Sequence, residues 1–141
     1  MRDRIAVVQA DVAGPLRAGA FDFVVANPPW VAAPDLDETG QPCVYADGGP
    51  TGFELPRRFL HDAARLLRPG GVAVVCCLDR RPPGDEPTPL DDTVADLRAR
   101  PLDVEVIPTS PRPGEPAPAP TTDARDPPTV RHVAVVVRRP R

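Results

Sequence analysis

Apolar residues along the chain form short runs whose spacing changes between the periods of strands and helices. Three runs rich in β-branched residues, at residues 5–9, 21–26 and 72–77, predict buried strands. Apolar and acidic residues alternate over 102–106, which predicts a half-exposed strand, and residues 130–137 predict a last one. The sequence therefore predicts at least five strands.

Two amphipathic helices are expected between these strands. The first has Thr51 and Glu54 at capping-box spacing, and its apolar residues recur every three or four positions: Leu55, Phe59, Ala63, Leu66 and Leu67. Pro69-Gly70-Gly71 should end it. A shorter helix is predicted over residues 90–100, before Pro101. Strands that alternate with helices indicate an α/β fold with right-handed crossovers, and the apolar run at 72–77 indicates that helices cover both faces of the sheet.

Composition limits how much of the chain can fold. The 141 residues suffice for one domain, and many of the 22 prolines lie in the C-terminal half. Residues 109–129 are rich in proline and poor in large apolar side chains, so we expect a disordered insertion there. The predicted domain comprises residues 1–108 and 130–137, followed by a basic, solvated tail at 138–141.

Charge and cysteine content exclude few classes of function. The net charge of −3 disfavours binding to duplex DNA, since a domain held by phosphate contacts is usually basic. Cys43, Cys76 and Cys77 lack metal-ligand spacing, so no metal site is predicted. Because neighbouring residues in a strand point to opposite faces, Cys76 and Cys77 cannot both enter one site. No apolar run is long enough to span a membrane, and the expected location is the cytoplasm.

The candidate chemistry lies in Asn27-Pro28-Pro29-Trp30, which follows a predicted strand and contains the only asparagine and the only tryptophan. Pro29 restricts its own backbone and that of Pro28, so the loop is stiff before any ligand binds. Neither proline has an N–H group, so hydrogen bonds there are accepted by carbonyls and by the Asn27 amide oxygen. Such a loop suits a substrate that brings its own N–H groups. A proline-stiffened loop with Trp30 in the core is the alternative.

The tetrapeptide resembles the Asn-Pro-Pro-aromatic signature of class I S-adenosylmethionine-dependent methyltransferases that modify exocyclic amines or the glutamine side chain. The resemblance implies that Asn27 and Pro28 act in catalysis and that Pro29 and Trp30 bind the substrate. It also implies that S-adenosylmethionine is the cofactor, contacted by Asp11 and Asn27. His61 and His132 are interpreted as structural.

Two further segments are similar to the release-factor glutamine methyltransferase group: Gly48-Gly49 with Gly52, and the turn that ends in Gly70-Gly71. They favour a protein substrate, such as a translation factor, over a nucleic acid or a small molecule. The family begins with two strands and a Gly-x-Gly-x-Gly loop that have no counterpart before residue 5. The resemblance therefore implies a partial Rossmann-like sheet that lacks its first two strands. It leaves open a non-catalytic remnant, or a module that binds a separate N-terminal half.

Overall fold

The structure is a computed structural model that describes residues 5–32, 41, 45–82, 86–109 and 129–141. Two helices, α1 (Glu54–Leu66) and α2 (Pro89–Arg98), accompany four strands. The strands are β1 (Phe21–Ala26), β2 (Leu67–Arg81), β3 (Asp103–Pro108) and β4 (Thr129–Arg138). The α/β class is confirmed, and the predicted disordered insertion falls mainly on residues outside the described ranges.

The strands form one mixed sheet in the order β1-β2-β4-β3. β1 and β2 are parallel, whereas β4 is antiparallel to both β2 and β3. β2 and β3 are thus two parallel strands with β4 between them. Because β1 and β2 are parallel and joined through α1, their carboxyl ends point toward the same edge of the sheet, although β2 continues to Arg81 beyond the end of β1. The Asn27 loop leaves β1 at this edge.

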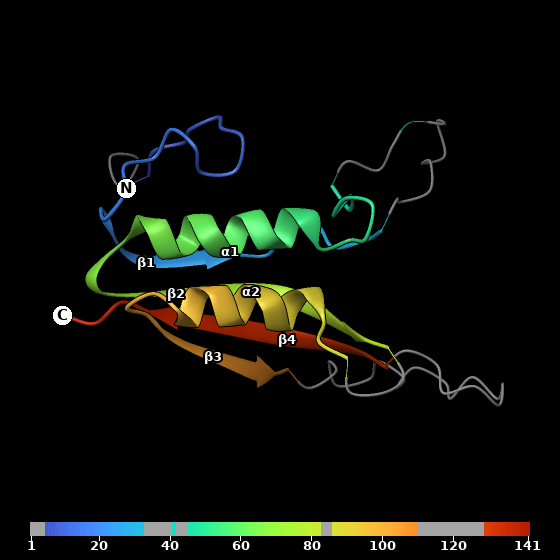
Figure 1. Ribbon diagram of the computed structural model, residues 1–141. Helices are drawn as coiled ribbons and strands as arrows, with labels where there is room; N and C mark the ends of the chain where they lie inside the picture. The colour runs from blue at the N-terminus through green and yellow to red at the C-terminus, as the bar shows by residue number, and fades with distance from the viewer. Residues whose placement is uncertain (1–4, 33–40, 42–44, 83–85, 110–128) are drawn as a thin grey trace, which may run out of the picture.

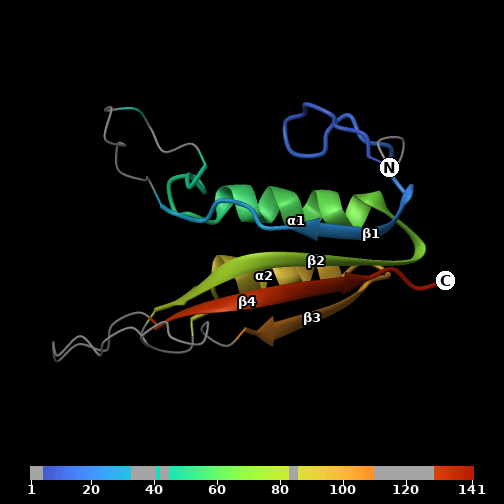
Figure 2. The same cartoon turned by 180° about the vertical axis from the view of Figure 1, so that it is seen from behind.

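Both helices cover the same face of the sheet, as the front and back views show (Figure 1, Figure 2). Their apolar side chains share one core with the strand residues that point toward them, and the fully buried members are Leu60, Leu67, Leu97, Ala73, Val75, Val135 and Val137. Removing such side chains from water is the main favourable term in folding. The core therefore lies between the helices and one face of the sheet.

The prediction that helices cover both faces is wrong for the part of the chain that the structure describes. Buried and half-buried residues alternate along β2, with Cys77 buried and Cys76 half-buried. Burial raises the pKa of the Cys77 thiol to about 12. The two cysteines thus point to opposite faces as predicted, but the apolar residues on the second face have no described helix over them.

The predicted strand at residues 5–9 is not a strand in the structure. Ile5 and Val7 are 79% and 93% exposed, and β1, the nearest strand in the sequence, is at an edge of the sheet. The following segment is held on α1, since the Arg65 guanidinium donates hydrogen bonds to the carbonyls of Ala13 and Leu16. Without a neighbouring strand, the backbone N–H and C=O groups of this apolar run have no partners for the hydrogen bonds of a sheet.

The helix boundaries follow local capping. α1 begins at Glu54 with Phe53 as its N-cap, and no side chain caps it. The predicted capping box is only half formed there, because the Glu54 carboxylate accepts from the Thr51 N–H and hydroxyl. At α2 the box is complete: the Thr88 hydroxyl accepts from the Asp91 N–H, and the Asp91 carboxylate accepts from the Thr88 N–H. That backbone hydrogen bond holds the pKa of Asp91 below its ordinary value.

We expect Thr88→Ala to lower the free energy of unfolding by about 1 kcal/mol, since it removes the N-cap of α2. Urea unfolding followed by circular dichroism would measure the change. Thr51→Ala is the matched control, because the exposed Thr51 hydroxyl does not cap a helix, and it should cost less than about 0.5 kcal/mol. Equal losses from the two variants would contradict the assigned capping role.

The C-terminal arginines are not a free tail. Arg138 is the last residue of β4 and forms ion pairs with Asp103 and Glu105 of β3. The Arg139 N–H donates to the carbonyl of Gly71, and its guanidinium donates to the carbonyl of Leu67. The expected tail is thus partly an extension of the sheet.

None of the described helices is long and apolar enough to cross a membrane.

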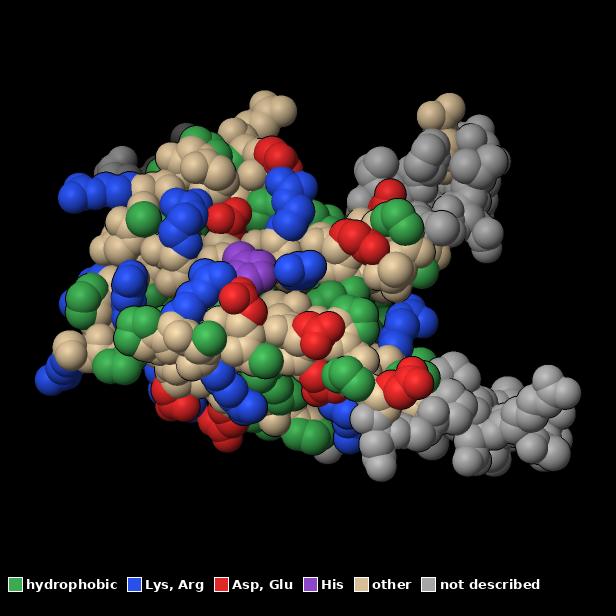
Figure 3. Space-filling view, in the orientation of Figure 1, with side chains coloured by type: hydrophobic (Ala, Val, Ile, Leu, Met, Phe, Trp, Pro, Cys, Tyr) green, Lys and Arg blue, Asp and Glu red, His purple; other side chains and the backbone are tan. Residues whose placement is uncertain are grey.

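Acidic and basic side chains are intermixed over the helical side of the molecule (Figure 3). His61 of α1 lies there, with Nδ1 3.6 Å from an Asp96 carboxylate oxygen of α2, which agrees with its interpretation as structural.

Candidate functional site

Asn27 is the first residue after β1, at the carboxyl end of that strand, and the neighbouring strand β2 continues past it to Arg81. It is exposed, Pro28 behind it is buried, and Pro29 and Trp30 are half-buried. The four residues line an open cavity of ≈ 210 Å³ together with Val31, Tyr45 and Ala46. The structure therefore brings the whole predicted tetrapeptide to one cavity, with the amide of Asn27 accessible to a ligand.

A second loop holds the tetrapeptide in place. The Val31 N–H donates to the carbonyl of Ala46 at 2.9 Å, and the Gly48 N–H donates to the carbonyl of Val31 at 2.9 Å. Val31 and Asp47 thereby form an isolated parallel bridge. The backbone that follows Trp30 is thus fixed by hydrogen bonds as well as by the two prolines before it.

Glycine is required where this second loop touches Trp30. A Cβ on Gly48 would lie 2.7 Å from the Trp30 Cα, and one on Gly52 would lie 2.5 Å from the Trp30 carbonyl oxygen. Gly52 also has a φ of +81°, which side-chain-bearing residues rarely adopt. The Gly48 carbonyl then accepts from the Leu55 N–H at 3.0 Å, which ties the loop to α1. The glycine spacing that carried the family resemblance therefore has a packing reason.

The Trp30 side chain meets a residue from the other end of the chain. Its ring centroid is 5.6 Å from that of His132 on β4, with an angle of 78° between the ring planes. Because β2 lies between β1 and β4, the loop after β1 must cross β2 near Leu78, the residue that pairs with His132. From the sequence alone His132 is interpreted as structural, without a partner, and no local signal could have revealed its contact with Trp30, since the two residues are far apart in the chain.

Asp11 does not line the Asn27 cavity but pairs with a residue of a neighbouring one. Its carboxylate, 81% exposed, forms an ion pair of 2.6 Å with Arg58 of α1. Arg58 lines an open cavity of ≈ 250 Å³ together with Asp47, Gly48, Gly49, Glu54 and Leu55. The Gly48 loop therefore separates the two cavities. Val12, directly after Asp11, has a φ of +52°, which is strained for a β-branched residue.

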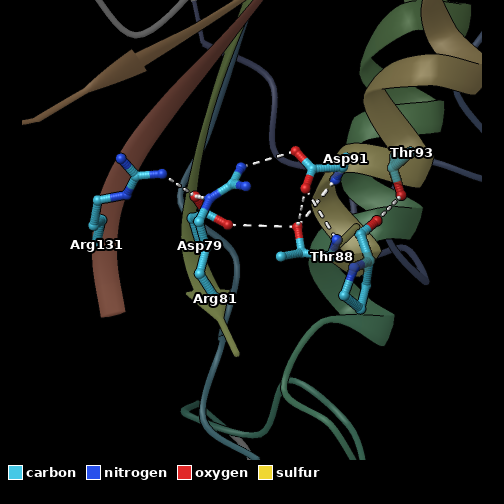
Figure 4. A network of polar contacts seen from close by, with 7 residues as sticks. Asp79, Arg81, Thr88, Asp91, Thr93 and Arg131 are labelled. Atoms are coloured by element: carbon cyan, nitrogen blue, oxygen red, sulfur yellow. Dashed lines mark hydrogen bonds and ion pairs between the residues drawn. The ribbon is translucent and has the colours of Figure 1, made fainter. Parts of the chain in front are cut away.

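A buried acid that the sequence analysis did not single out supports this edge of the sheet (Figure 4). Asp79 of β2 is 1% exposed, and one of its carboxylate oxygens accepts from Arg81 and from Arg131 of β4, each at 2.8 Å. Arg81 also pairs with Asp91 at the start of α2. The cluster joins β2, β4 and α2, and each charge in it has a partner, as buried charges require.

Chemically, the Asn27 cavity offers hydrogen-bond acceptors. The Asn27 amide oxygen and the carbonyls of Pro28 and Pro29 can each accept an N–H, and the prolines offer no competing donor. Among the residues that the structure describes, no group of three His, Cys, Asp or Glu side chains could hold a metal ion. The arrangement suits the binding and orientation of an amide or amino nitrogen.

Known proteins resemble about half of the chain. It is 43% identical over 74 residues to a release factor glutamine methyltransferase of Moorella thermoacetica, which covers 49% of this chain and 26% of that protein. It is 29% identical over 80 residues to a ribosomal protein uL3 glutamine methyltransferase of Francisella tularensis, covering 53% of this chain and 26% of that protein. The matches thus span about a quarter of the length of these relatives.

The structure was also compared with solved ones. A candidate DNA modification methylase of Thermus thermophilus superposes with a TM-score of 0.49 and 19% identity, covering 92% of this chain and 51% of that one. No protein-family model matches the chain. Over about half of its length, the chain is homologous by sequence to part of the glutamine methyltransferases of release factors and of ribosomal protein uL3.

Proposed function

We propose that this chain carries the methyl-acceptor part of an S-adenosylmethionine-dependent methyltransferase, with the glutamine side chain of a protein as the favoured acceptor. The observation that carries the proposal is the exposed Asn27 amide beside buried Pro28, in a cavity whose backbone is fixed on both sides. The homology to glutamine methyltransferases supports the choice of chemistry.

The acceptor nitrogen is a poor nucleophile, because its lone pair is delocalised into the adjoining carbonyl. Asn27 Oδ1 and the Pro28 carbonyl each accept one N–H of the substrate amide, which turns the lone pair toward the methyl donor. These acceptors stabilise the positive charge that develops on nitrogen during transfer, so their effect is electrostatic preorganisation. Asn27 cannot take a proton at neutral pH, and the proton leaves to solvent afterwards.

S-Adenosylmethionine would supply the electrophilic methyl group. The residues present fit part of this cofactor: the exposed carboxylate of Asp11 and the amide oxygen of Asn27 can accept hydrogen bonds from its amino and hydroxyl groups. Asn27 lines one cavity, and Arg58, the ion-pair partner of Asp11, lines the neighbouring cavity beyond the Gly48 loop. We infer that Asp11 binds the cofactor and that Asn27 lies between cofactor and substrate.

A protein acceptor is favoured over the other substrates. The net charge of −3 and the intermixed charges on the helical side do not suit a long contact with phosphates (Figure 3). The named relatives are glutamine methyltransferases of a release factor and of a ribosomal protein. A translation factor is therefore the proposed substrate, with an adenine of nucleic acid or a small molecule as the alternatives.

A second candidate function rests on the free edge of the sheet. Among the strands that the structure describes, β1 pairs only with β2, and its Phe23 and Val25 side chains are 60% and 65% exposed on the face opposite the helices. An unpaired apolar edge strand is a template for pairing with another strand. The chain would then be a binding module that joins a separate polypeptide with the remaining cofactor contacts, or a remnant that no longer catalyses.

Calorimetric titration with S-adenosylmethionine tests these functions. Micromolar binding by the chain alone is expected if it holds the cofactor unaided, and Asp11→Asn should weaken that binding. Binding only after addition of the N-terminal part of the Moorella thermoacetica relative would support the module. Absence of binding under both conditions would contradict the proposed methyltransferase function for this polypeptide.

A further inference from the structure

Trp30 is fixed through its backbone, but its side chain needs a partner of its own. Pro29 before it and the Val31 hydrogen bonds after it restrain the main chain. They do not determine where the indole points, since rotation about χ1 remains. Among the described residues, His132 is the one aromatic ring in contact with the indole. The perpendicular arrangement at 5.6 Å is a favoured geometry for two aromatic rings.

His132 is itself held firmly. It pairs with Leu78 of β2 in the antiparallel ladder, and its carbonyl accepts from the Thr109 N–H at 2.9 Å. The preceding residue, Arg131, forms the ion pair of 2.8 Å with buried Asp79 (Figure 4). The imidazole thus projects from a strand that is fixed to its neighbours on both sides.

We propose that His132 is a positioning residue for the acceptor site: its ring holds the Trp30 indole as a fixed wall of the Asn27 cavity. The inference rests on the proposed function, because it assigns a role in binding the methyl acceptor. It makes β4, the last strand, part of a site whose other residues come from the loops around residues 27–31 and 45–46. His132 acts through Trp30 and does not touch the reacting atoms.

The physical consequence concerns substrate binding more than chemistry. Asn27 and Pro28 orient the nitrogen, and their positions depend on β1 and on the second loop rather than on His132. Loss of the imidazole allows the indole to adopt other rotamers, so the substrate then binds in a cavity whose indole side is no longer fixed. The KM for the acceptor should then rise while kcat changes little, because binding is weakened in the ground state and the transition state alike.

The test compares His132→Ala with His132→Phe, which retains an aromatic ring, and with Val130→Ala as a matched control. Val130 is 41% exposed and lies two residues from His132 on the same strand. Trp30 is the only tryptophan, so fluorescence excited at wavelengths that tyrosine does not absorb, and the longest-wavelength bands of near-ultraviolet circular dichroism, report on this indole rather than on Tyr45 or the phenylalanines. In His132→Ala we expect greater quenching by acrylamide and a weaker near-ultraviolet signal, with both restored in His132→Phe and unchanged in Val130→Ala.

Kinetics provide the second readout. His132→Ala should raise the KM for a glutamine-containing acceptor about three- to tenfold, the loss expected for one aromatic pair, with kcat within about twofold. Unchanged quenching in His132→Ala, or equal changes in Val130→Ala, would overturn the positioning role. A loss confined to kcat would also overturn it. The spectroscopic results decide the role of His132 even if the chain proves to transfer no methyl group, an outcome that would count against the proposed function alone.

Discussion

Replacement of Asn27 by alanine should lower the rate of methyl transfer about a hundredfold or more, the usual cost of removing one oriented group that stabilises transition-state charge. Asn27 is exposed at the end of β1 and is the one side-chain amide lining its cavity. The variant keeps the Pro28 carbonyl but loses the second acceptor, so the substrate nitrogen is no longer held with its lone pair toward the donor. The rate is measured by transfer of a radioactive methyl group from S-adenosylmethionine to a glutamine-containing protein.

The fold should survive this change, because an exposed residue at the end of an edge strand contributes little to the core. Val31→Ala is the matched control: it removes an exposed side chain from the same loop and leaves the backbone hydrogen bonds to Ala46 and Gly48 intact. Its rate should stay within about threefold of the unmodified chain. A near-normal rate in Asn27→Ala would contradict the proposed mechanism, whereas equal losses in both variants would indicate a general disturbance of the loop.

Most elements of this fold follow from local sequence patterns. The helical spacing of Phe59 and Ala63, the apolar run in β2 and the alternation in β3 each describe a face that packs against the core. Residues 5–9 carry the same β-branched signal but do not form a strand, because a strand needs a neighbour and a pattern does not say whether one is present. The continuous apolar run in β2 likewise predicts burial on both faces, although the described helices cover one (Figure 2).

The candidate site divides in the same way. The Asn27 tetrapeptide could be predicted because its chemistry lies in consecutive residues at the end of a strand. His132 and the buried Asp79 could not, because each acquires its role from contacts across the sheet, with Trp30 and with Arg131. Asp11 falls between these cases: the resemblance indicated a cofactor residue, and the structure places it on Arg58 beside the second cavity. Its role stays a prediction.

Replacement of Gly52 in the second loop should lower both the stability of the chain and the rate of methyl transfer. Gly52→Ala would place a Cβ 2.5 Å from the Trp30 carbonyl oxygen and 2.9 Å from the Ala32 nitrogen, so one of the two loops must move. The new residue would also have to adopt a φ of +81°. We expect the free energy of unfolding to fall by about 2–5 kcal/mol, the sum of the strain at positive φ and of overpacking. Methyl transfer should fall at least about tenfold, since displacement of the Trp30 backbone misplaces the adjoining acceptors.

Gly19→Ala separates the two causes. Gly19 has a similar φ of +65°, but a Cβ there would meet nothing within 4 Å. This control should therefore show only the backbone strain, about 1–2 kcal/mol, with methyl transfer and Trp30 fluorescence unchanged. Urea unfolding and the emission of Trp30 measure both variants. If Gly52→Ala lost no more stability than Gly19→Ala and left the Trp30 emission unaltered, the second loop would not position the tetrapeptide. The glycine spacing would then reflect turn geometry alone.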